Sequence, residues 1–307
     1  MVIQFHRSAG YVAGAIYAAN SNNLHLSDCQ IFEATADRVG GALFLGGESK
    51  SIITNVTMTG CDGVFGGSVV VSEFAHASFY DCFILNSTSK TSGGSIAVSG
   101  HATAIFERLI VANSQPTSSG SAAYLEDSSS TTFIDTLFFN NSSPADGGAI
   151  YATDMATFNI SKSKFQWNFA SISGGAIFLS TSATAIIDSS TFEQSTCGSM
   201  GGAIAATSDS IVIMTNTSIS KSSAISGGAF FCTDRSLATL TNCVVQNNTA
   251  LSRGGAAFMS SIAKFSLIST VMKHNVAYNG IGGALAFQDY SGGELLHSSF
   301  VQNVAAH

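Results

Sequence analysis

The stretch SGGAIFLS, residues Ser173–Ser180, joins a glycine pair to a small residue and three apolar ones. Near-copies begin at residues 40, 147, 201, 227 and 282, where they read GGALFL, GGAIYA, GGAIAA, GGAFFC and GGALAF. A phosphate-binding loop carries a lysine and leads into a helix. These pairs lack lysine and lead into β-branched and aromatic residues. We therefore interpret each pair as a tight corner of a repeated β structure, where residues without Cβ allow positive φ and close stacking.

The repeat is explicit when the second residue of each pair is counted as position 0 of a unit. Eleven units, spaced 26 to 28 residues apart, then cover the chain in register. Position +1 is always Ala or Ser, and positions +2, +12 and +17 are apolar. Position 0 is Gly14 in the first unit and Ser121 in the fifth. In the other units it is Gly41, Gly67, Gly94, Gly148, Gly175, Gly202, Gly228, Gly255 and Gly283.

Each unit contains three short apolar runs separated by Gly, Ser, Asn and Asp, a pattern typical of strands and turns. Stacking such units in parallel pairs each strand with the next copy and buries a continuous core. We predict an all-β fold, a single-stranded right-handed parallel β-helix of about eleven coils with three short strands per coil, forming one domain over residues 1–307. A leucine-rich repeat has a similar period, but it requires leucine columns and a helical return that this sequence lacks.

Position +20 is small or polar in every unit and is asparagine in five of them. These asparagines are Asn141, Asn168, Asn248, Asn275 and Asn303. Stacked asparagine side chains form hydrogen-bonded ladders in assemblies of in-register strands. We therefore interpret this column as a structural ladder inside a turn rather than as a row of ligands.

The two motifs alternate in fixed phase. Strict GGAL or GGAI occurs at residues 40, 147, 174, 201 and 282, and F-x-x-N begins in register at Phe138, Phe165 and Phe300. This combination resembles the repeats of the polymorphic membrane proteins of chlamydiae, and similar repeats of other bacterial and some protist surface proteins. The resemblance covers all eleven units. It implies a surface-exposed β-helical passenger that adheres to a partner cell.

Composition narrows the classes of partner. With 12 basic and 19 acidic residues the formal net charge is −7, which disfavours nucleic acid. No window approaches 18 uninterrupted apolar residues, so we expect no transmembrane segment, and the first residues do not read as a signal peptide. The cysteines contain no CxxC pair and are predicted to be small buried fillers rather than zinc ligands: Cys29, Cys61, Cys82, Cys197, Cys232 and Cys243.

Acidic residues recur at the turn after the first strand. They are Glu48, Glu73, Asp127, Asp154, Asp209, Asp234 and Asp289. Carboxylates of adjacent coils could share Ca²⁺, but Asp and Asn are also ordinary turn formers. A second column, of Asp and Asn at another turn, has the same two interpretations: Asp28, Asn55, Asp81, Asp135, Asn216 and Asn242. We expect no cofactor, with calcium as the alternative.

The search for catalytic groups finds no constellation. The seven histidines share no column, and no strand column stacks carboxylates with one another or with lysine on consecutive coils. A polysaccharide-cleaving site needs such a cluster for acid–base chemistry. We predict that the protein is not an enzyme, with a polysaccharide-active β-helix enzyme as an alternative.

One column suggests binding. If positions +2 and +4 point into the core, strand alternation sends position +3 outward. This column forms an aromatic stripe: Tyr17, Phe44, Tyr124, Tyr151, Phe178, Phe231 and Phe258. Exposed apolar stripes mark interaction surfaces. The stripe is either such a surface or is covered by a neighbouring segment or by another copy.

These observations favour a non-enzymatic scaffold that is extracellular or displayed on a cell surface. We expect it to adhere to a protein or glycan on another surface through the side of the β-helix. A filament or coat subunit that stacks end to end with copies of itself is the structural alternative.

Overall fold

The computed structural model describes residues 3–20 and 23–306. All regular structure in this part of the chain is β-strand, and the strands pair in parallel. The all-β prediction is therefore confirmed.

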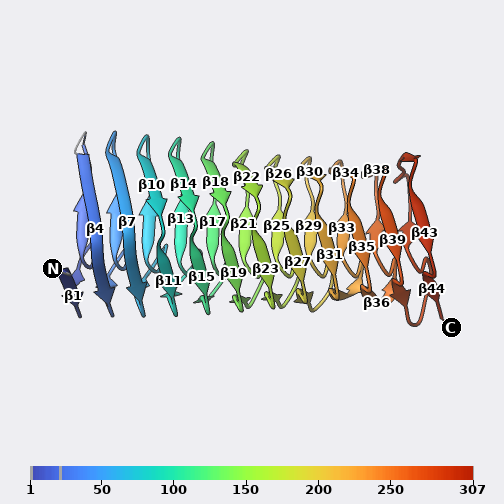
Figure 1. Ribbon diagram of the computed structural model, residues 1–307, viewed down its shortest axis with the longest axis horizontal. Helices are drawn as coiled ribbons and strands as arrows, with labels where there is room; N and C mark the ends of the chain where they lie inside the picture. Colours follow the sequence, from blue (N-terminus) through green and yellow to red (C-terminus); the bar gives the residue numbers. More distant parts are fainter. Residues whose placement is uncertain (1–2, 21–22, 307) are drawn as a thin grey trace. The chain divides into compact units, whose positions relative to one another are not determined.

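Figure 1 shows the strands of successive coils in sequence order. The coils group into two compact units. Unit 1 consists of the residues up to Pro144 together with Ala149–Asn159. Unit 2 consists of Ala145–Gly148 and the residues from Ile160 onward. Both units are built from the same repeat, and the boundary between them falls within β22 (Thr157–Ser161). A single domain over residues 1–307 stays a prediction.

The seventh coil, which begins at Gly175, shows the plan of each unit. Its strands are β25 (Ile177–Leu179), β26 (Thr184–Asp188), β27 (Thr191–Glu193) and β28 (Thr196–Cys197). The first three are the predicted strands. The fourth was not predicted, because two residues between turns carry too little alternation to be recognised.

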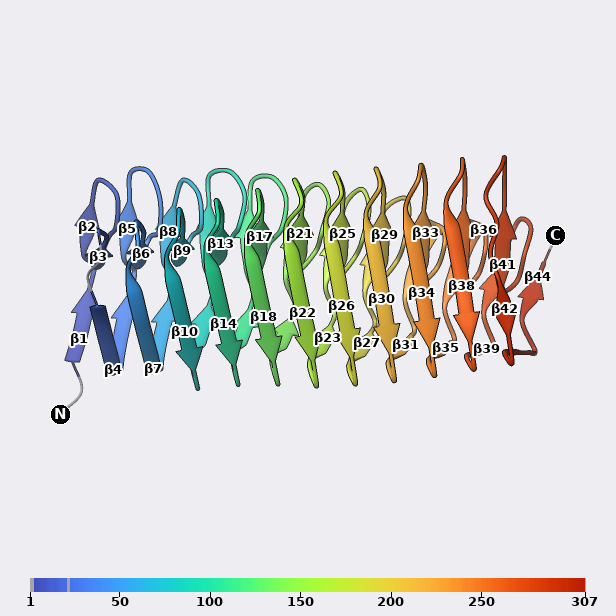
Figure 2. The same cartoon turned by 90° about the horizontal axis from the view of Figure 1, so that it is seen from above.

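In unit 1 the equivalent strands lie side by side (Figure 2). First strands are β3 (Ile16–Ala18), β6 (Leu43–Leu45), β9 (Val69–Val71), β13 (Ile96–Val98), β17 (Ala123–Leu125) and β21 (Ile150–Ala152). Second strands are β4 (Asn23–Phe32), β7 (Lys50–Thr59), β10 (His76–Tyr80), β14 (Thr103–Glu107) and β18 (Ser130–Ile134). The strand β1 (Ile3–His6) pairs with the C-terminal half of β4 and so takes the place of a third strand. Third strands are β11 (Phe83–Leu85), β15 (Ile110–Ala112) and β19 (Leu137–Phe139), continuing β4 and β7. Fourth strands are β2 (Ala9–Gly10), β5 (Thr35–Ala36), β8 (Asp62–Gly63), β12 (Thr88–Ser89), β16 (Gln115–Pro116) and β20 (Ser142–Ser143).

Unit 2 repeats this order. First strands after β25 are β29 (Ile204–Ala206), β33 (Phe230–Cys232), β37 (Ala257–Met259) and β41 (Leu285–Phe287). Second strands after β26 are β30 (Ile211–Thr215), β34 (Leu237–Thr241), β38 (Lys264–Ile268) and β42 (Leu295–Leu296). Third strands are β23 (Lys164–Gln166), β27, β31 (Ser218–Ser220), β35 (Val244–Gln246), β39 (Val271–Lys273) and β43 (Ser299–Val301). Fourth strands are β24 (Phe169–Ala170), β28, β32 (Ser223–Ser226), β36 (Thr249–Arg253), β40 (Val276–Ala277) and β44 (Val304–Ala305).

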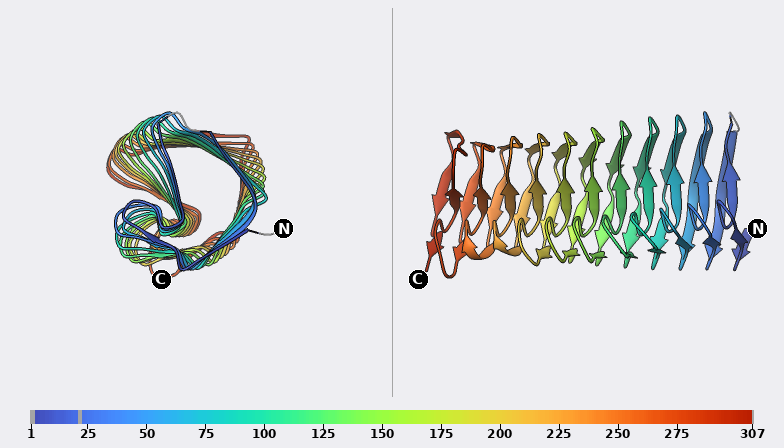
Figure 3. Two further views of the ribbon diagram at one scale, coloured as in Figure 1. Left: turned by 90° about the vertical axis from the view of Figure 1, so that its left-hand side faces the viewer. Right: turned by 180° about the vertical axis from the view of Figure 1, so that it is seen from behind.

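Pairing in register places equivalent residues of successive coils on top of one another, so the coils of each unit nearly superpose in end view (Figure 3). Columns +2, +4, +12 and +17 point inward and fill the core, except in the eleventh coil, where Phe287, Leu295 and Phe300 are 39–48% exposed. In unit 1 the +12 rings of Phe79, Phe106 and Phe133 stack with centroids 4.8 and 5.2 Å apart. Since every coil shares its apolar contacts with its neighbours, the core runs through each unit.

The two glycines of each corner have different tasks. The first has positive φ, for example +64° at Gly174, which disfavours residues with a side chain. The second has an ordinary φ but lies against the next coil: a Cβ on Gly175 would be 2.2 Å from the carbonyl oxygen of Gly202. The predicted role of the glycine pairs, positive φ combined with close stacking, is confirmed.

The asparagines at +20 form the predicted ladder. Residues at +19, such as Asn247 with φ +55°, turn the chain and interrupt backbone pairing. The amide of the next coil fills the gap, because the backbone N–H of Asn248 donates to Asn275 Oδ1 at 3.0 Å. The Asn275 backbone N–H donates in turn to Asn303 Oδ1 at 3.0 Å, and in unit 1 Ser114 N–H donates to Asn141 Oδ1 at 3.1 Å. Asn168 is also fully buried.

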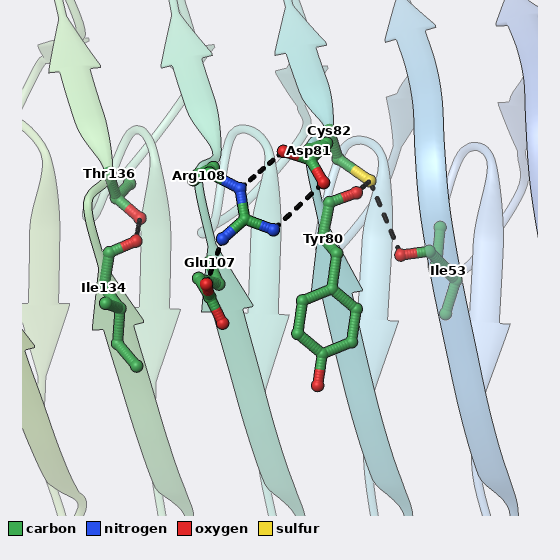
Figure 4. Close-up of polar contacts among 8 residues, drawn as sticks. All are labelled: Ile53, Tyr80, Asp81, Cys82, Glu107, Arg108, Ile134 and Thr136. Carbon is green, nitrogen blue, oxygen red and sulfur yellow. Dashed lines mark hydrogen bonds and ion pairs between the residues drawn. The ribbon is translucent and has the colours of Figure 1, made fainter.

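A second ladder at position +15 was not predicted. There the N–H of Ser190 donates to Thr217 Oγ1, and the N–H of Cys243 donates to Thr270 Oγ1, both at 3.2 Å. This corner turns at the second Asp/Asn column, whose side chains tolerate positive φ. Figure 4 shows it in unit 1, where Cys82 Sγ lies 3.2 Å from the carbonyl oxygen of Tyr80.

Candidate functional site

The aromatic stripe is only partly accessible. Tyr17 is 58% exposed, and Phe44, Tyr124, Tyr151 and Phe178 are half-buried. Phe231 and Phe258 are buried, with exposed fractions of 5% and 4%. The prediction of an outward, exposed stripe is therefore wrong for these last two rings. The alternative, cover by a neighbouring segment, describes them.

The covering segment lies between the asparagine corner and the next glycine pair. In unit 2, Met200 from this segment packs against the cluster that contains Phe231 and Phe258, and the Arg253 guanidinium lies 5.4 Å from the Phe258 ring centroid. In unit 1, Phe65 lies edge-on to Tyr124 at 5.5 Å. Position +3 does point away from the main core, but this segment folds over it and makes a second, smaller core.

The half-buried part of the stripe in unit 1 adjoins a group of carboxylates. Tyr124 and Tyr151 stack with centroids 5.2 Å apart and ring planes 6° apart. Burial, followed by the charges of Asp127 and Asp154, raises the pKa of Glu126 to about 7. The neighbouring carboxylates of Asp127 and Asp154 thus act on Glu126 in the same direction as burial.

The predicted acidic column serves the turns in which it lies. Glu73 Oε2 accepts a hydrogen bond from the Gly47 backbone N–H at 2.8 Å, and Asp127 Oδ2 accepts one from Gly100 at 3.0 Å. Among the described residues, no group of three or more His, Cys, Asp or Glu side chains could hold a metal ion. Calcium binding therefore has no ready-made cluster in this part of the chain.

The second Asp/Asn column also serves structure. Arg108 donates from Nε and Nη2 to Asp81 at 2.6 and 3.0 Å, and its Nη1 contacts Glu107 (Figure 4). These hydrogen bonds lower the pKa of Asp81. Because the pair is on the surface, its contribution to stability is small.

The cysteines are buried and unpaired. Burial raises the thiol pKa of Cys82 to about 11 and that of Cys232 to about 12. The expectation that they fill space in the interior is confirmed.

Several exposed side chains lie at the tips of the turns between first and second strands, which are the loops at the upper edge of Figure 1. In unit 2 we define the turn-tip ridge as positions +6 and +7 of each coil. It comprises Thr181, Ser182, Ser208, Asp209, Asp234, Arg235, Ser261, Ile262, Asp289 and Tyr290. The equivalent positions of unit 1 include Phe74, His101 and Met155.

Large apolar side chains occupy several of these tips. Phe74 is 57% exposed, Met155 60%, Ile262 44% and Tyr290 84%. In unit 1 the Phe74 ring stacks on His101 with centroids 5.2 Å apart. None of these side chains is needed to close a core. The sequence reading missed position +7 because it varies from coil to coil, although apolar residues in a turn otherwise rich in Asp and Ser were a detectable signal.

The turn-tip ridge of unit 2 is hollowed. A cavity of about 650 Å³ runs across four coils, from Ser208 and Asp209 to Asp289 and Tyr290. Its centre is held by Arg235, which donates from Nε and Nη2 to the carboxylate of Asp209 at 2.5 and 2.7 Å. This pairing lowers the pKa of Asp209. At one end, Asp289 Oδ2 accepts from the Ser261 backbone N–H at 3.3 Å. A second hollow, in unit 1, lies beside Phe74 and His76.

Comparison with protein families finds one match for this repeated structure. The right-handed beta helix region matches residues 4–172 and again residues 148–306. The chain belongs to the right-handed β-helix family. Its fold is a parallel right-handed β-solenoid of about eleven turns, as predicted. Comparison with curated proteins and with solved structures finds no match.

The family match supports a right-handed β-helix, but it does not support the narrower resemblance to the chlamydial repeats. Among the described residues, no helix is long and apolar enough to cross a membrane.

Proposed function

We propose that this right-handed β-helix protein is a non-enzymatic scaffold, extracellular or on a cell surface, which adheres to a partner through its turn tips. The observation that carries the proposal is the exposure of Phe74, Met155, Ile262 and Tyr290, 44–84%, at positions that no core requires. Exposed apolar residues on a rigid frame are typical of interaction sites. The resemblance to polymorphic membrane protein repeats supports adhesion and surface display.

Different positions of the repeat are under different packing constraints, and this difference supports the same proposal. Inward columns are restricted to small, apolar or ladder-forming residues by coil-to-coil stacking. Turn-tip side chains meet solvent and carry no such packing restriction, although the backbone at position +6 has positive φ. A recognition surface could therefore change without altering the fold.

Adhesion is tested by coating beads with the full chain and measuring retention on a panel of cells and on arrays of glycans and proteins. The ridge variant Ile262→Ser/Tyr290→Ser should reduce retention. Its matched control is Ile213→Ser/Leu237→Ser, because these side chains are 39% and 38% exposed on second strands. The control should retain the beads as well as the parent.

Three outcomes would contradict the proposal. If the coated beads were retained on no surface, the proposal of adhesion would be wrong. Fibres in negative-stain microscopy would favour the filament alternative. Turnover of polysaccharides would favour the enzyme alternative.

A further inference from the structure

We propose that the hollow on the turn-tip ridge of unit 2 is a subsite for a neutral oligosaccharide that lies along the ridge. This inference rests on the proposed function and names the chemical class of its ligand.

The polar groups repeat once per coil. Position +6 reads Ser208, Asp234, Ser261 and Asp289 on four successive coils, so hydroxyl and carboxylate alternate. Parallel strands stack about 4.8 Å apart, close to the repeat of an extended β-linked pyranose chain. A chain of sugars running along the ridge therefore meets one hydrogen-bonding side chain per residue.

The apolar contact lies at one end of the hollow. Tyr290 is 84% exposed and Ile262, on the preceding coil, is 44% exposed. An aromatic face and an aliphatic side chain match the apolar C–H face of a pyranose ring, while the phenol remains free to hydrogen-bond. A ligand that buries these two side chains removes apolar surface from water, which favours binding.

The charges of the hollow, three carboxylates and one guanidinium, disfavour an anionic ligand. Arg235 is fixed by Asp209, so its positive charge is largely compensated while N–H groups stay available as donors. The carboxylates of Asp234 and Asp289 take part in no ion pair among the described residues. They repel uronates and sulfated sugars and accept hydrogen bonds from sugar hydroxyls. A basic peptide is the alternative that these carboxylates also allow, and competition with oligolysine distinguishes it from a sugar.

The test is isothermal titration calorimetry of the full chain with neutral linear hexasaccharides of β-1,4-linked glucose, mannose and N-acetylglucosamine. At least one should bind. Tyr290→Ala should weaken that binding by about tenfold or more, equal to about 1.4 kcal/mol. Tyr290→Phe should keep most of the affinity, because the ring is retained. Tyr278→Ala is the matched control, since Tyr278 is 54% exposed just after β40 and away from the hollow.

Any of four results would overturn the proposal: no neutral hexasaccharide binds, Tyr290→Ala binds as the parent does, hexagalacturonate binds as tightly, or an oligolysine peptide competes with the sugar. A thermal melt of each variant shows whether it is folded. The bead assay separates the two levels of inference. Adhesion that persists without saccharide binding leaves the proposed function standing and removes only the subsite, whereas absent adhesion removes the function.

Discussion

The asparagine ladder makes a quantitative prediction at Asn275. Its Oδ1 accepts from the backbone N–H and the Nδ2 of Asn248, both at 3.0 Å, and its Nδ2 donates to the Val245 carbonyl at 3.0 Å and to Asn303 Oδ1 at 2.8 Å. Asn275 is fully buried. Asn275→Ala therefore leaves the Asn248 N–H without its acceptor and takes a donor from Val245. At about 1–2 kcal/mol for each buried group left unsatisfied, the loss is about 2–4 kcal/mol.

The assay is urea unfolding followed by circular dichroism, with amide exchange by mass spectrometry over residues 244–250. Exchange in that segment should accelerate in Asn275→Ala. Gln246→Ala is the control, because Gln246 lies on the coil of Asn248, the partner of Asn275, and its side chain is half-buried at the end of β35. A stability of Asn275→Ala within about 0.5 kcal/mol of the parent, the usual range of surface substitutions, with unchanged exchange would refute the ladder's energetic role.

Asn275→Asp extends the test to pH. The carboxylate keeps the acceptor but loses both donor contacts, and burial raises its folded-state pKa above the unfolded value of about 3.9. A carboxyl whose pKa is raised on folding gives its full stability below the unfolded pKa, and this is lost as pH rises through the folded pKa. The variant should therefore be nearest to the parent in acid and weakest at neutral pH, and a difference independent of pH would contradict this account.

Three further predictions follow from particular contacts. Gly255→Ala should lower the melting temperature strongly or prevent folding, because its Cβ would be 2.2 Å from a backbone oxygen, whereas Gly292→Ala, with only a lysine side-chain atom at 3.8 Å, should melt like the parent; equal effects would contradict the stacking argument. Ala203→Ser should stabilise the folded protein by about 1 kcal/mol, because the buried Ser222 Oγ lacks a hydrogen-bond partner. In unit 1 the serines at the equivalent positions, Ser68 with Ser87 and Ser95 with Ser114, have their Oγ atoms 2.6 Å apart. If the double variant with Ser222→Ala kept the gain, the pairing would be refuted. The pKa of Glu126 is raised to about 7, so the parent should lose stability as pH rises from about 4.5, and Glu126→Gln should flatten that part of the melting curve; parallel curves would contradict it.

The sequence determined the fold because the chain's constraints are local and repeated. A corner that needs positive φ selects glycine, and a carbonyl of the next coil within reach of Cβ selects a second glycine, so both appear in nearly every unit. Period-two apolar runs then mark the strands. The asparagine ladder was predictable for the same reason, since an amide is the side chain that bridges a break in stacked backbone pairing.

Only the tertiary structure decided which outward side chains meet solvent. Alternation places Phe178, Phe231 and Phe258 outside the main core, but whether they are exposed depends on the segment before each glycine pair, from which Met200 and Arg253 pack against them. Tyr290 and Ile262 show the reverse case, since the repeat aligns the turn tips but only the structure shows that four of them line one hollow. The sequence shows the period of the repeat directly. Whether the outer face of the first strands is covered depends on packing between segments that the period does not relate.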